Sequence, residues 1–296
     1  MKYAWIETQR STFPLPVLCD ALSVSQSGFR AWLSGGTRER KRLTDAQALV
    51  LIRTIHQEVQ QAYGSRRIHA ELRGRGYRIG LTRIERLMRD HGIRARHKRR
   101  YKATTDSRHS LPVAANVLDR HFAPDAPNRV WTGDITYIAT AEGWLYLAVV
   151  IDLFNREVIG WSIKPRMTTD LVLNALSMAW LRRRPAPGGL FHSDRGSQYA
   201  SQAYQDCLSR YGMTASMSRK GNCWDNAPTE SFFNSLKNER VHGVSYATRA
   251  EAASDLFQHI AVFYNRRRRH SRLGYLSPTA FLQNWIERQN QQEMAA

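Results

Sequence analysis

The chain has 296 residues, a length that fits two domains or one large domain with a smaller module. Its hydrophobic content of 42% is enough for a packed core, and no apolar run approaches the length of a membrane span. The first residues lack the apolar region of a signal peptide. Three cysteines without a CxxC pair favour a reducing compartment and argue against a zinc site. We therefore expect a cytoplasmic protein without a membrane partner.

The net charge of +19 is concentrated in the first part of the chain. Residues 1–125 carry 24 Lys and Arg against 11 Asp and Glu, whereas the remaining 171 residues carry 20 against 14. This distribution predicts a basic arm that holds DNA and a less basic catalytic body. Two alternatives are a soluble basic protein without a specific partner and a protein that binds acidic membranes. Nucleic acid is favoured because the arginines follow helical patterns without an amphipathic membrane face.

A helix-turn-helix-like segment is expected over residues 1–36. Apolar residues between positions 14 and 33 recur at helical spacing on both sides of Ser23-Val24-Ser25, which predicts two short helices joined by a turn. Ser25 is a suitable N-cap for the second helix. Many small helical hairpins share this pattern, so the pattern alone does not establish DNA binding.

A second basic unit, made of three helices, is expected over residues 44–100. Apolar periodicity predicts one helix from about Asp45 to Val59 and another from Arg66 to Gly74. A third helix around Ile84 should stop at Gly92. This unit carries much of the positive charge of the arm.

The third helix and the connector after it supply candidate DNA contacts. Arg83, Arg86 and Arg89 recur every three residues along the helix, and Arg99 and Arg100 lie in the connector. Arginines placed in this way track phosphates without reading base sequence. A solvated arginine face is the alternative interpretation.

A polar stretch without apolar periodicity predicts a linker over residues 101–126, and strands begin after it. Three β-rich runs with short connections predict an antiparallel meander. Helices and short strands then alternate. The expected strands are 130–139, 145–153, 157–163, a short one ending at Ser193, and 214–217; the expected helices are 169–182, 202–211 and one from Asn226 to about Asn238.

Three acidic residues in this body have no obvious local partner. Asp134 lies within the first strand, Asp194 ends a short apolar run, and Glu230 lies in the first turn of the helix that Asn226 is predicted to cap. Glu230 alone would be explained by the helix dipole. If the three carboxylates converge, they stay ionised together only when a cation neutralises them, and oxygen ligands suit Mg²⁺ or Mn²⁺.

Five motifs carry a resemblance to a known family: WTGDITYI, LYLAVVIDLFNREVIGWSI, FHSDRGSQY, GNCWDNAPTESFFNSLK and YNRRRRHSRLGYLSP. Positions 195–229, which number 35, separate Asp194 from Glu230. On these motifs the chain resembles the DDE transposases of the retroviral-integrase type. It is similar in particular to the second-frame (OrfB) proteins of the insertion sequence three family.

The resemblance implies an α/β fold, with an RNase H-like catalytic core over residues 127–285 that follows the helical DNA-binding modules. It also implies that the three-helix unit over residues 44–100 is the helix-turn-helix module that precedes this core. The core would have a mixed five-stranded sheet with helices. Asp134, Asp194 and Glu230 would then be both the catalytic residues and the ligands of two Mg²⁺ or Mn²⁺ ions. The implied reaction is metal-dependent DNA strand cleavage and strand transfer at insertion-sequence ends. A DNA-binding regulator and an RNase H-like nuclease without joining activity are the alternatives. Asp152, which ends the second strand, is assigned a structural role because the resemblance places the metal ligands elsewhere.

Further DNA contacts are expected near the end of the chain. Lys237 lies seven residues after Glu230, on the same helix face, and the family usually has a basic residue at this spacing. Arg268 and His270 belong to a basic cluster for which DNA binding and core packing are both open. Residues 286–296 are expected to form a frayed tail.

The expected partner is double-stranded DNA, both the terminal repeats of the element and the target. The resemblance also implies a homo-oligomer assembled on DNA, and a fusion to an upstream-frame product. A protein of this kind would be associated with the nucleoid when it is bound to DNA.

Overall fold

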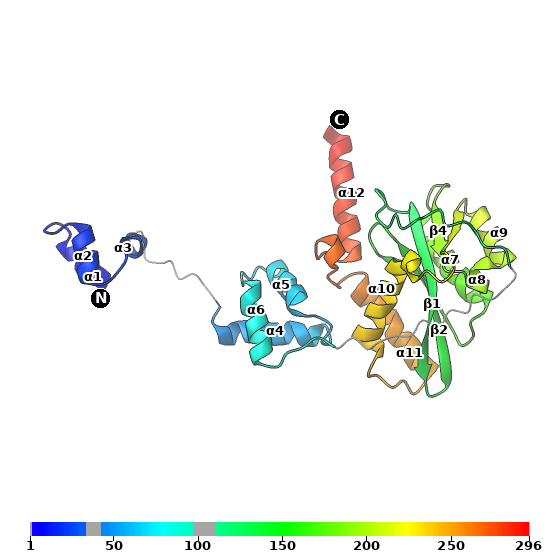
Figure 1. The fold of residues 1–296 in the computed structure, drawn as a ribbon, viewed down its shortest axis with the longest axis horizontal. Coiled ribbons are helices and arrows are strands. Elements are labelled where there is room, and N and C mark those ends of the chain that lie inside the picture. The colour runs from blue at the N-terminus through cyan, green and yellow to red at the C-terminus, as the bar shows by residue number, and fades with distance from the viewer. Residues whose placement is uncertain (1, 34–42, 97–110, 296) are drawn as a thin grey trace.

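The computed structural model describes residues 2–33, 43–96 and 111–295 (Figure 1). Arg99 and Arg100, two of the predicted DNA contacts, and residues 101–110 of the predicted linker lie outside these residues. The described chain forms hydrophobic cores at three places: an N-terminal helical unit, the helix-turn-helix module and the sheet-containing body. The exact domain boundaries stay predictions.

The N-terminal unit consists of helices α1 (Lys2–Gln9), α2 (Leu15–Ala21) and α3 (Gln26–Leu33). The two predicted helices are α2 and α3, and Ser25 Oγ accepts the N–H of Gly28 at 3.0 Å, as expected of an N-cap. Helix α1 was not predicted because it carries no apolar stripe. Its Ile6 nevertheless has no exposed surface and packs with Leu18 and Phe29.

The helix-turn-helix module contains α4 (Asp45–Glu58), α5 (Ser65–Gly74) and α6 (Leu81–Asp90), close to the predicted bounds. Thr44 and Gln47 form a reciprocal capping box that begins α4. The helix ends coincide with glycines at positive φ, Gly76 at 85° and Gly92 at 65°. Both positions favour glycine because other residues pay a steric cost there. The three helices enclose their own apolar core.

The body is built on a five-stranded mixed sheet in the order β3-β2-β1-β4-β5. Strands β1 (Val130–Thr140), β2 (Gly143–Asp152) and β3 (Val158–Lys164) form the predicted antiparallel meander. Strands β4 (Leu190–Ser193) and β5 (Thr214–Met217) continue the sheet in parallel with β1. The α/β fold predicted from the family resemblance is therefore confirmed.

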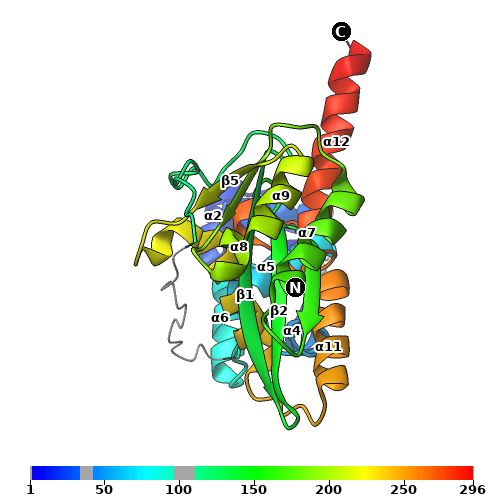
Figure 2. The ribbon, with the colours of Figure 1, turned by 90° about the vertical axis from the view of Figure 1, so that its right-hand side faces the viewer.

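Helices cover both faces of the sheet (Figures 1 and 2). Helices α7 (Thr169–Arg183), α8 (Ser197–Ala200) and α9 (Gln202–Arg210) pack with the β1 face that carries Trp131. Helices α10 (Ala227–Leu236) and α11 (Arg249–Phe257) pack on the opposite face, around Leu147 and Val149 of β2. Val149 pairs with Asp134 of β1, so Asp134 also faces the α10 side.

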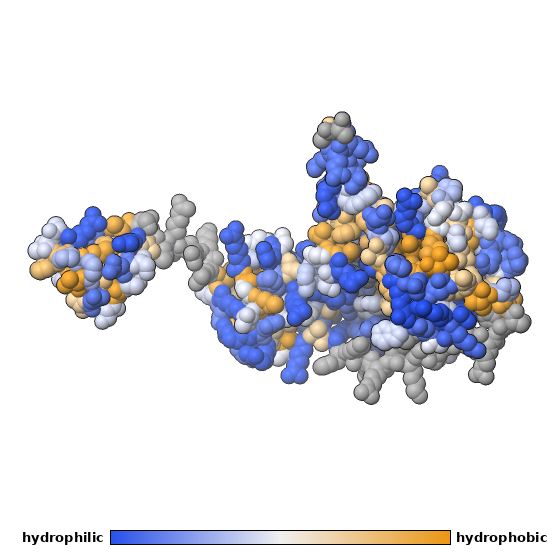
Figure 3. All heavy atoms as spheres, turned by 45° about the horizontal axis from the view of Figure 1, so that its top comes forward, coloured by the Kyte–Doolittle hydropathy of each residue, from blue (hydrophilic) through white to orange (hydrophobic). Residues whose placement is uncertain are grey.

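Helix α12 (Pro278–Ala295) projects away from the body (Figure 2). The prediction of a frayed tail over 286–296 is wrong for the described residues, because α12 continues to Ala295. Phe281 and Trp285 near its start lie against Phe154, with ring centroids 5.5 Å apart in both pairs. The projecting part of the helix is predominantly hydrophilic (Figure 3).

Gly160 of β3 allows α7 to lie directly on the sheet. A Cβ atom at this position would lie 2.2 Å from the carbonyl oxygen of Ala175 and 2.7 Å from the backbone nitrogen of Ala179. Both atoms belong to the helix backbone, so they cannot move aside as a flexible side chain would. The close contact fixes the distance between α7 and the sheet.

Gly160→Ala should therefore lower the free energy of unfolding by about 1–3 kcal/mol, because the added methyl group pushes α7 off the sheet. Urea unfolding followed by circular dichroism measures the change. Leu181→Ala, on the exposed side of the same helix, is the control and should stay within about 0.5 kcal/mol of the parent. Equal stability of the Gly160→Ala variant and the parent would contradict this packing.

Candidate active site

The sheet brings Asp134 and Asp194 to neighbouring strands. Thr132 of β1 pairs with His192 of β4 in a parallel register. Asp134 and Asp194 each follow two residues after that pair, so they occupy equivalent positions along adjacent chain segments. Asp194 lies just past the end of β4, where its Oδ1 accepts the N–H of Gly196 at 2.9 Å. The pairing register between β1 and β4 could not be predicted from the order of the strands in the sequence.

Buried hydrogen bonds hold the start of α10 against β1. The hydroxyl of Thr132 donates to Asn226 Oδ1 at 2.8 Å, and the hydroxyl of Thr229 donates to the same oxygen at 3.0 Å. The two hydroxyl oxygens lie 2.8 Å apart. Asn226 was predicted to cap α10, and this is wrong in detail, because its side chain binds the two threonines instead of the helix N–H groups. Glu230, the residue after Thr229, is thereby fixed relative to β1.

The three carboxylates influence one another electrostatically. Burial raises the pKa of Asp134 well above its usual value, and the charges of Asp194 and Glu230 raise it further. Burial and the charge of Asp194 also raise the pKa of Glu230. Mutual repulsion of this kind requires that the three groups lie near one another. We therefore treat them as one cluster.

The cluster is not tightly closed. Among residues 2–33, 43–96 and 111–295, no set of three His, Cys, Asp or Glu side chains is arranged to hold a metal ion. Asp134 Oδ1 accepts the N–H of Ile135 at 2.7 Å, so part of its hydrogen-bonding capacity is used locally. The carboxylates are thus close enough to raise one another's pKa without being gathered into a ligand set. Carboxylate oxygens are nevertheless the type of ligand that hard divalent cations prefer.

Lys237 lies at the same site, as its spacing from Glu230 predicted. It begins a π-helical segment, Lys237–Val241, that continues α10, and only 7% of the residue is exposed. Its Nζ lies 4.9 Å from the ring centroid of Tyr137. Burial lowers the pKa of Lys237 to about 8, an effect that the charge of Asp134 opposes. The ammonium group is thus an internal counter-charge of the acidic cluster.

Arg268 and His270 do not present charges to a ligand in this structure. Arg268 is 3% exposed, and its guanidinium donates to both carboxylate oxygens of Glu239, at 2.6 and 2.5 Å. Burial and the nearby Arg268 lower the pKa of His270 to about 4, so the imidazole is neutral at pH 7. The predicted DNA contacts at these two residues are corrected: Arg268 is a core ion-pair partner and His270 is an uncharged, partly buried side chain.

The α6 arginines differ in their availability. Arg83 and Arg86 both bind Asp45 of α4, with nitrogen–oxygen distances of 2.7 and 2.6 Å. The side chain of Arg89 is 77% exposed and lies 3.7 Å from Asp90. All three lie on the predicted third helix, and Arg89 presents the most accessible charge. Their contact with DNA stays a prediction.

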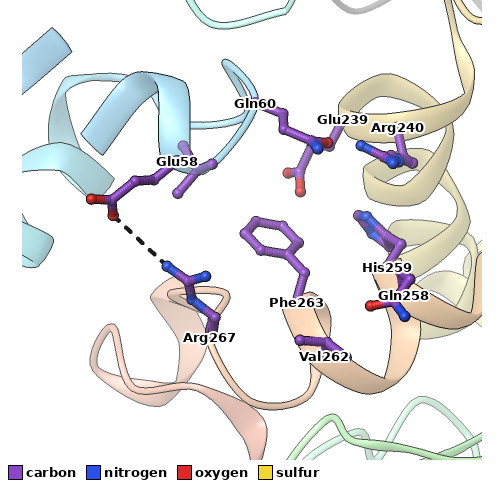
Figure 4. A pocket seen from close by; sticks show the side chains of 10 residues that line it. Glu58, Gln60, Glu239, Arg240, Gln258, His259, Val262, Phe263 and Arg267 are labelled. Atoms are coloured by element: carbon purple, nitrogen blue, oxygen red, sulfur yellow. Dashed lines mark ion pairs between the residues drawn. The ribbon is translucent and has the colours of Figure 1, made fainter. Parts of the chain in front are cut away.

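Ion pairs join the helix-turn-helix module to the end of the body. Arg67 of α5 lies 2.9 Å from Glu239, and Arg269 lies 2.7 Å from Glu71 of α5. Beside these contacts, a cavity of about 170 Å³ is lined by residues of both parts, including Glu58, His259 and Phe263 (Figure 4). None of Asp134, Asp194 and Glu230 lines it. We therefore assign the cavity to the interface between the two parts and not to the acidic cluster.

Three polar residues near the cluster have structural roles. Asp152 accepts the backbone N–H groups of Asn128 and Phe154, which agrees with the structural role expected for it. Asp225 is the centre of an ion-pair network with Arg120 and Arg219. His192 lies between the hydroxyls of Ser216 and Ser218, at 2.9 and 3.2 Å. No local sequence signal indicated these long-range partners.

Comparisons with known families define the class of this protein. Models described as "Integrase core domain" match residues 124–223 and 230–284, and a model described as "HTH-like domain" matches residues 43–101. The fold and these matches together identify a protein with an integrase-type catalytic core preceded by an HTH-like domain.

Curated relatives specify the family. "Transposase InsF for insertion sequence IS3A" of Escherichia coli (strain K12) is 43% identical over 95% of this chain and 98% of its own length. "Insertion element IS600 uncharacterized 31 kDa protein" of Shigella sonnei is 44% identical over 90% of this chain and 98% of its own length. The chain belongs to the IS3 family of insertion-sequence transposases, and it is an enzyme of the DDE transposase class.

Solved integrase structures align with the body. The catalytic core domain of HTLV-2 integrase in complex with magnesium (trimeric form) aligns with a TM-score of 0.40 and 18% identity, over 53% of this chain and 97% of that one. The catalytic core domain of BIV integrase gives a TM-score of 0.41 and 16% identity, over 55% and 99%. In the described part of the chain, no helix is both long and apolar enough to cross a membrane.

The hydroxyl of Thr229 should be required to hold α10 in place. Thr229→Val removes this hydroxyl, so the buried side chains of Thr132 and Asn226 each lose a hydrogen-bond partner. The loss should lower the free energy of unfolding by about 1–3 kcal/mol. We also expect slower cleavage of element-end DNA, because Glu230 is no longer fixed. Thr229→Ser keeps the hydroxyl and should keep most of the activity. Urea unfolding and a gel-based cleavage assay test both effects, and unchanged cleavage by Thr229→Val would contradict this role.

Proposed function

We propose that this transposase cleaves DNA strands at the ends of its insertion sequence and joins them to target DNA, with Asp134, Asp194 and Glu230 as the metal ligands. The observation that carries the proposal is the electrostatic coupling of three carboxylates that come from separate segments of the chain. A cluster that raises its own pKa values gains stability from a bound cation.

The donor set fits two divalent ions, Mg²⁺ or Mn²⁺, because all of its ligand atoms are carboxylate oxygens. When bound, such ions supply activation of the attacking oxygen and charge neutralisation at the leaving oxygen. The chain itself contributes positioning. Thr132 and Asn226 hold Glu230 near Asp134, and the turn that ends at Gly196 holds the carboxylate of Asp194.

Lys237 is proposed to meet a phosphate of the DNA end. Its ammonium lies among the residues of the acidic cluster, and a DNA end engaged by the carboxylates would pass close to it. In the absence of DNA, the same charge offsets part of the repulsion among the carboxylates. Lys237 thus has a role both in the DNA-bound protein and in the DNA-free protein.

The helix-turn-helix module is proposed to bind the double-stranded terminal repeats, with phosphate contacts from Arg83, Arg86 and Arg89. The matched HTH-like domain and the positive charge of the arm support this assignment. Target DNA would then approach the acidic cluster on the body. We further propose a homo-oligomer on DNA and an upstream-frame fusion partner, both by analogy with the family. A regulator or a nuclease without joining activity is not favoured, because the named relatives include transposases.

The domain division we propose is a helix-turn-helix-like segment over 1–36, the module over 44–100, a linker over 101–126 and the catalytic core over 127–285. The separate apolar cores of the first two units and of the body support it. Limited proteolysis of the full chain, with sequencing of the fragments, measures the boundaries directly.

Asp134→Asn, Asp194→Asn and Glu230→Gln should each abolish cleavage and joining, because each removes a charged metal ligand while keeping the side-chain size. DNA binding should stay near that of the parent. Asp152→Asn is the matched control: it alters a buried carboxyl of the same sheet, whose pKa burial raises to about 6, and the folded protein should keep its chemistry. Full activity of any one of the three variants would remove that residue from the ligand set.

Arg89→Ala should weaken DNA binding similarly on all sequences and lower the slope of log affinity against log salt by about 1. The reason is that one fewer phosphate contact releases one fewer counterion. Fluorescence anisotropy across a salt titration gives the slope. Arg288→Ala removes an equally charged, exposed arginine from α12 and should leave the slope unchanged. Identical slopes for the parent and Arg89→Ala would show that α6 does not lie on the phosphates.

A further inference from the structure

Trp224 presents its indole to solvent on the short segment that leads into α10, the helix of Glu230. The residue is 69% exposed and lies in a short 3₁₀ helix, Cys223–Asn226, directly before α10. It precedes Glu230 by six positions and Asn226 by two. Single exposed apolar residues are common on protein surfaces, so exposure alone carries no inference. The inference comes from how the residue is held and from what surrounds it.

The backbone on both sides of Trp224 is fixed. The Trp224 N–H donates to Asn222 Oδ1 at 3.2 Å. The next residue, Asp225, is 1% exposed and accepts from Arg219 Nε at 2.8 Å and from Arg120 Nε at 2.9 Å. These arginines hold the pKa of Asp225 well below its usual range, so the ion pairs persist at every working pH. Trp224 therefore projects from a rigid support.

Two cations lie four and five residues before Trp224 in the chain, and one of them, Arg219, also lies 3.4 Å from Asp119. Arg219 and Lys220 are both exposed, and the Arg219 side chain retains 47% of its exposure while it binds Asp225. The segment around residue 220, yellow in Figure 2, projects from the body near β5. A rigid aromatic plane flanked by cations is the arrangement that single-stranded nucleic acid requires, because bases stack on the ring while phosphates contact the cations.

We propose that Trp224 stacks on an unpaired nucleobase at the DNA end held by the acidic cluster, an inference that rests on the proposed function of that cluster. A base inside a duplex is already covered on both faces. An indole therefore stacks only on a terminal base or on one that has left the helix. The reacting phosphodiester lies at the element end, so a frayed base there is the nearest partner for the ring. Trp224 would thus separate and hold the end of the duplex.

Binding by the full chain carrying Glu230→Gln tests this without any catalytic turnover. The probe is duplex element-end DNA with 2-aminopurine as the terminal base, whose fluorescence reports stacking on the indole. Adding Trp224→Ala should remove the fluorescence response and weaken binding by about 5- to 150-fold, the range for loss of one base–aromatic stack. Trp224→Phe keeps an aromatic plane and should keep most of the response. Phe257→Ala, an exposed aromatic of α11, is the control and should behave as the parent.

A second experiment removes the terminal base from the DNA instead of the indole from the protein. On DNA with an abasic terminal position, Trp224→Ala and the parent should bind equally, because nothing remains to stack. An undiminished difference on abasic DNA, or an unchanged 2-aminopurine signal in Trp224→Ala, would overturn the proposal. Failure of the metal-ligand assignment appears separately, as retained cleavage by the carboxylate variants, and leaves the binding result unaffected.

Discussion

The hydrogen bonds among Thr132, Asn226 and Thr229 are the constraint on which the catalytic arrangement depends. They join the strand that carries Asp134 to the helix that carries Glu230, at a point where all three side chains are buried. A buried polar group costs free energy unless it is paired, so these groups favour one placement of α10 over others. The sheet register then supplies Asp194. The buried hydrogen bonds to α10 and the pairing of β1 with β4 thus together position the three carboxylates.

The same helix also connects the cluster to the DNA-binding module. Beyond Glu230 and Lys237 it reaches Glu239, whose carboxylate binds Arg268 of the body and Arg67 of α5. Such a buried ion pair adds little net stability, yet loss of one partner leaves an uncompensated charge and costs about 3–5 kcal/mol. Its main effect is therefore geometric. It holds the helix-turn-helix module in one relation to the helix that carries Glu230.

The sequence predicted the strands and most helices well, because alternating and helical periodicities are local signals. It failed where the partner is distant in sequence. Arg268 belongs to a run that suggests a DNA-binding surface, but Glu239 draws it into the interior. Asn226 has the character of a helix cap, but Thr132 of β1 takes its side-chain oxygen. Both outcomes depend on tertiary contacts that compete with local preferences. Periodicity in the sequence does not predict such contacts.

The topology has a consequence for how the enzyme is made. Ribosomal synthesis delivers β1 and β4 long before Glu230, and Arg268, which supports Glu239 on the continuation of the same helix, emerges later still. Asn265, whose side chain bonds both the N–H and the carbonyl of Val158 in β3, is equally late. A growing chain therefore has two of the acids without the third and without its support. The complete cluster, with its support, therefore forms only after the chain is nearly finished.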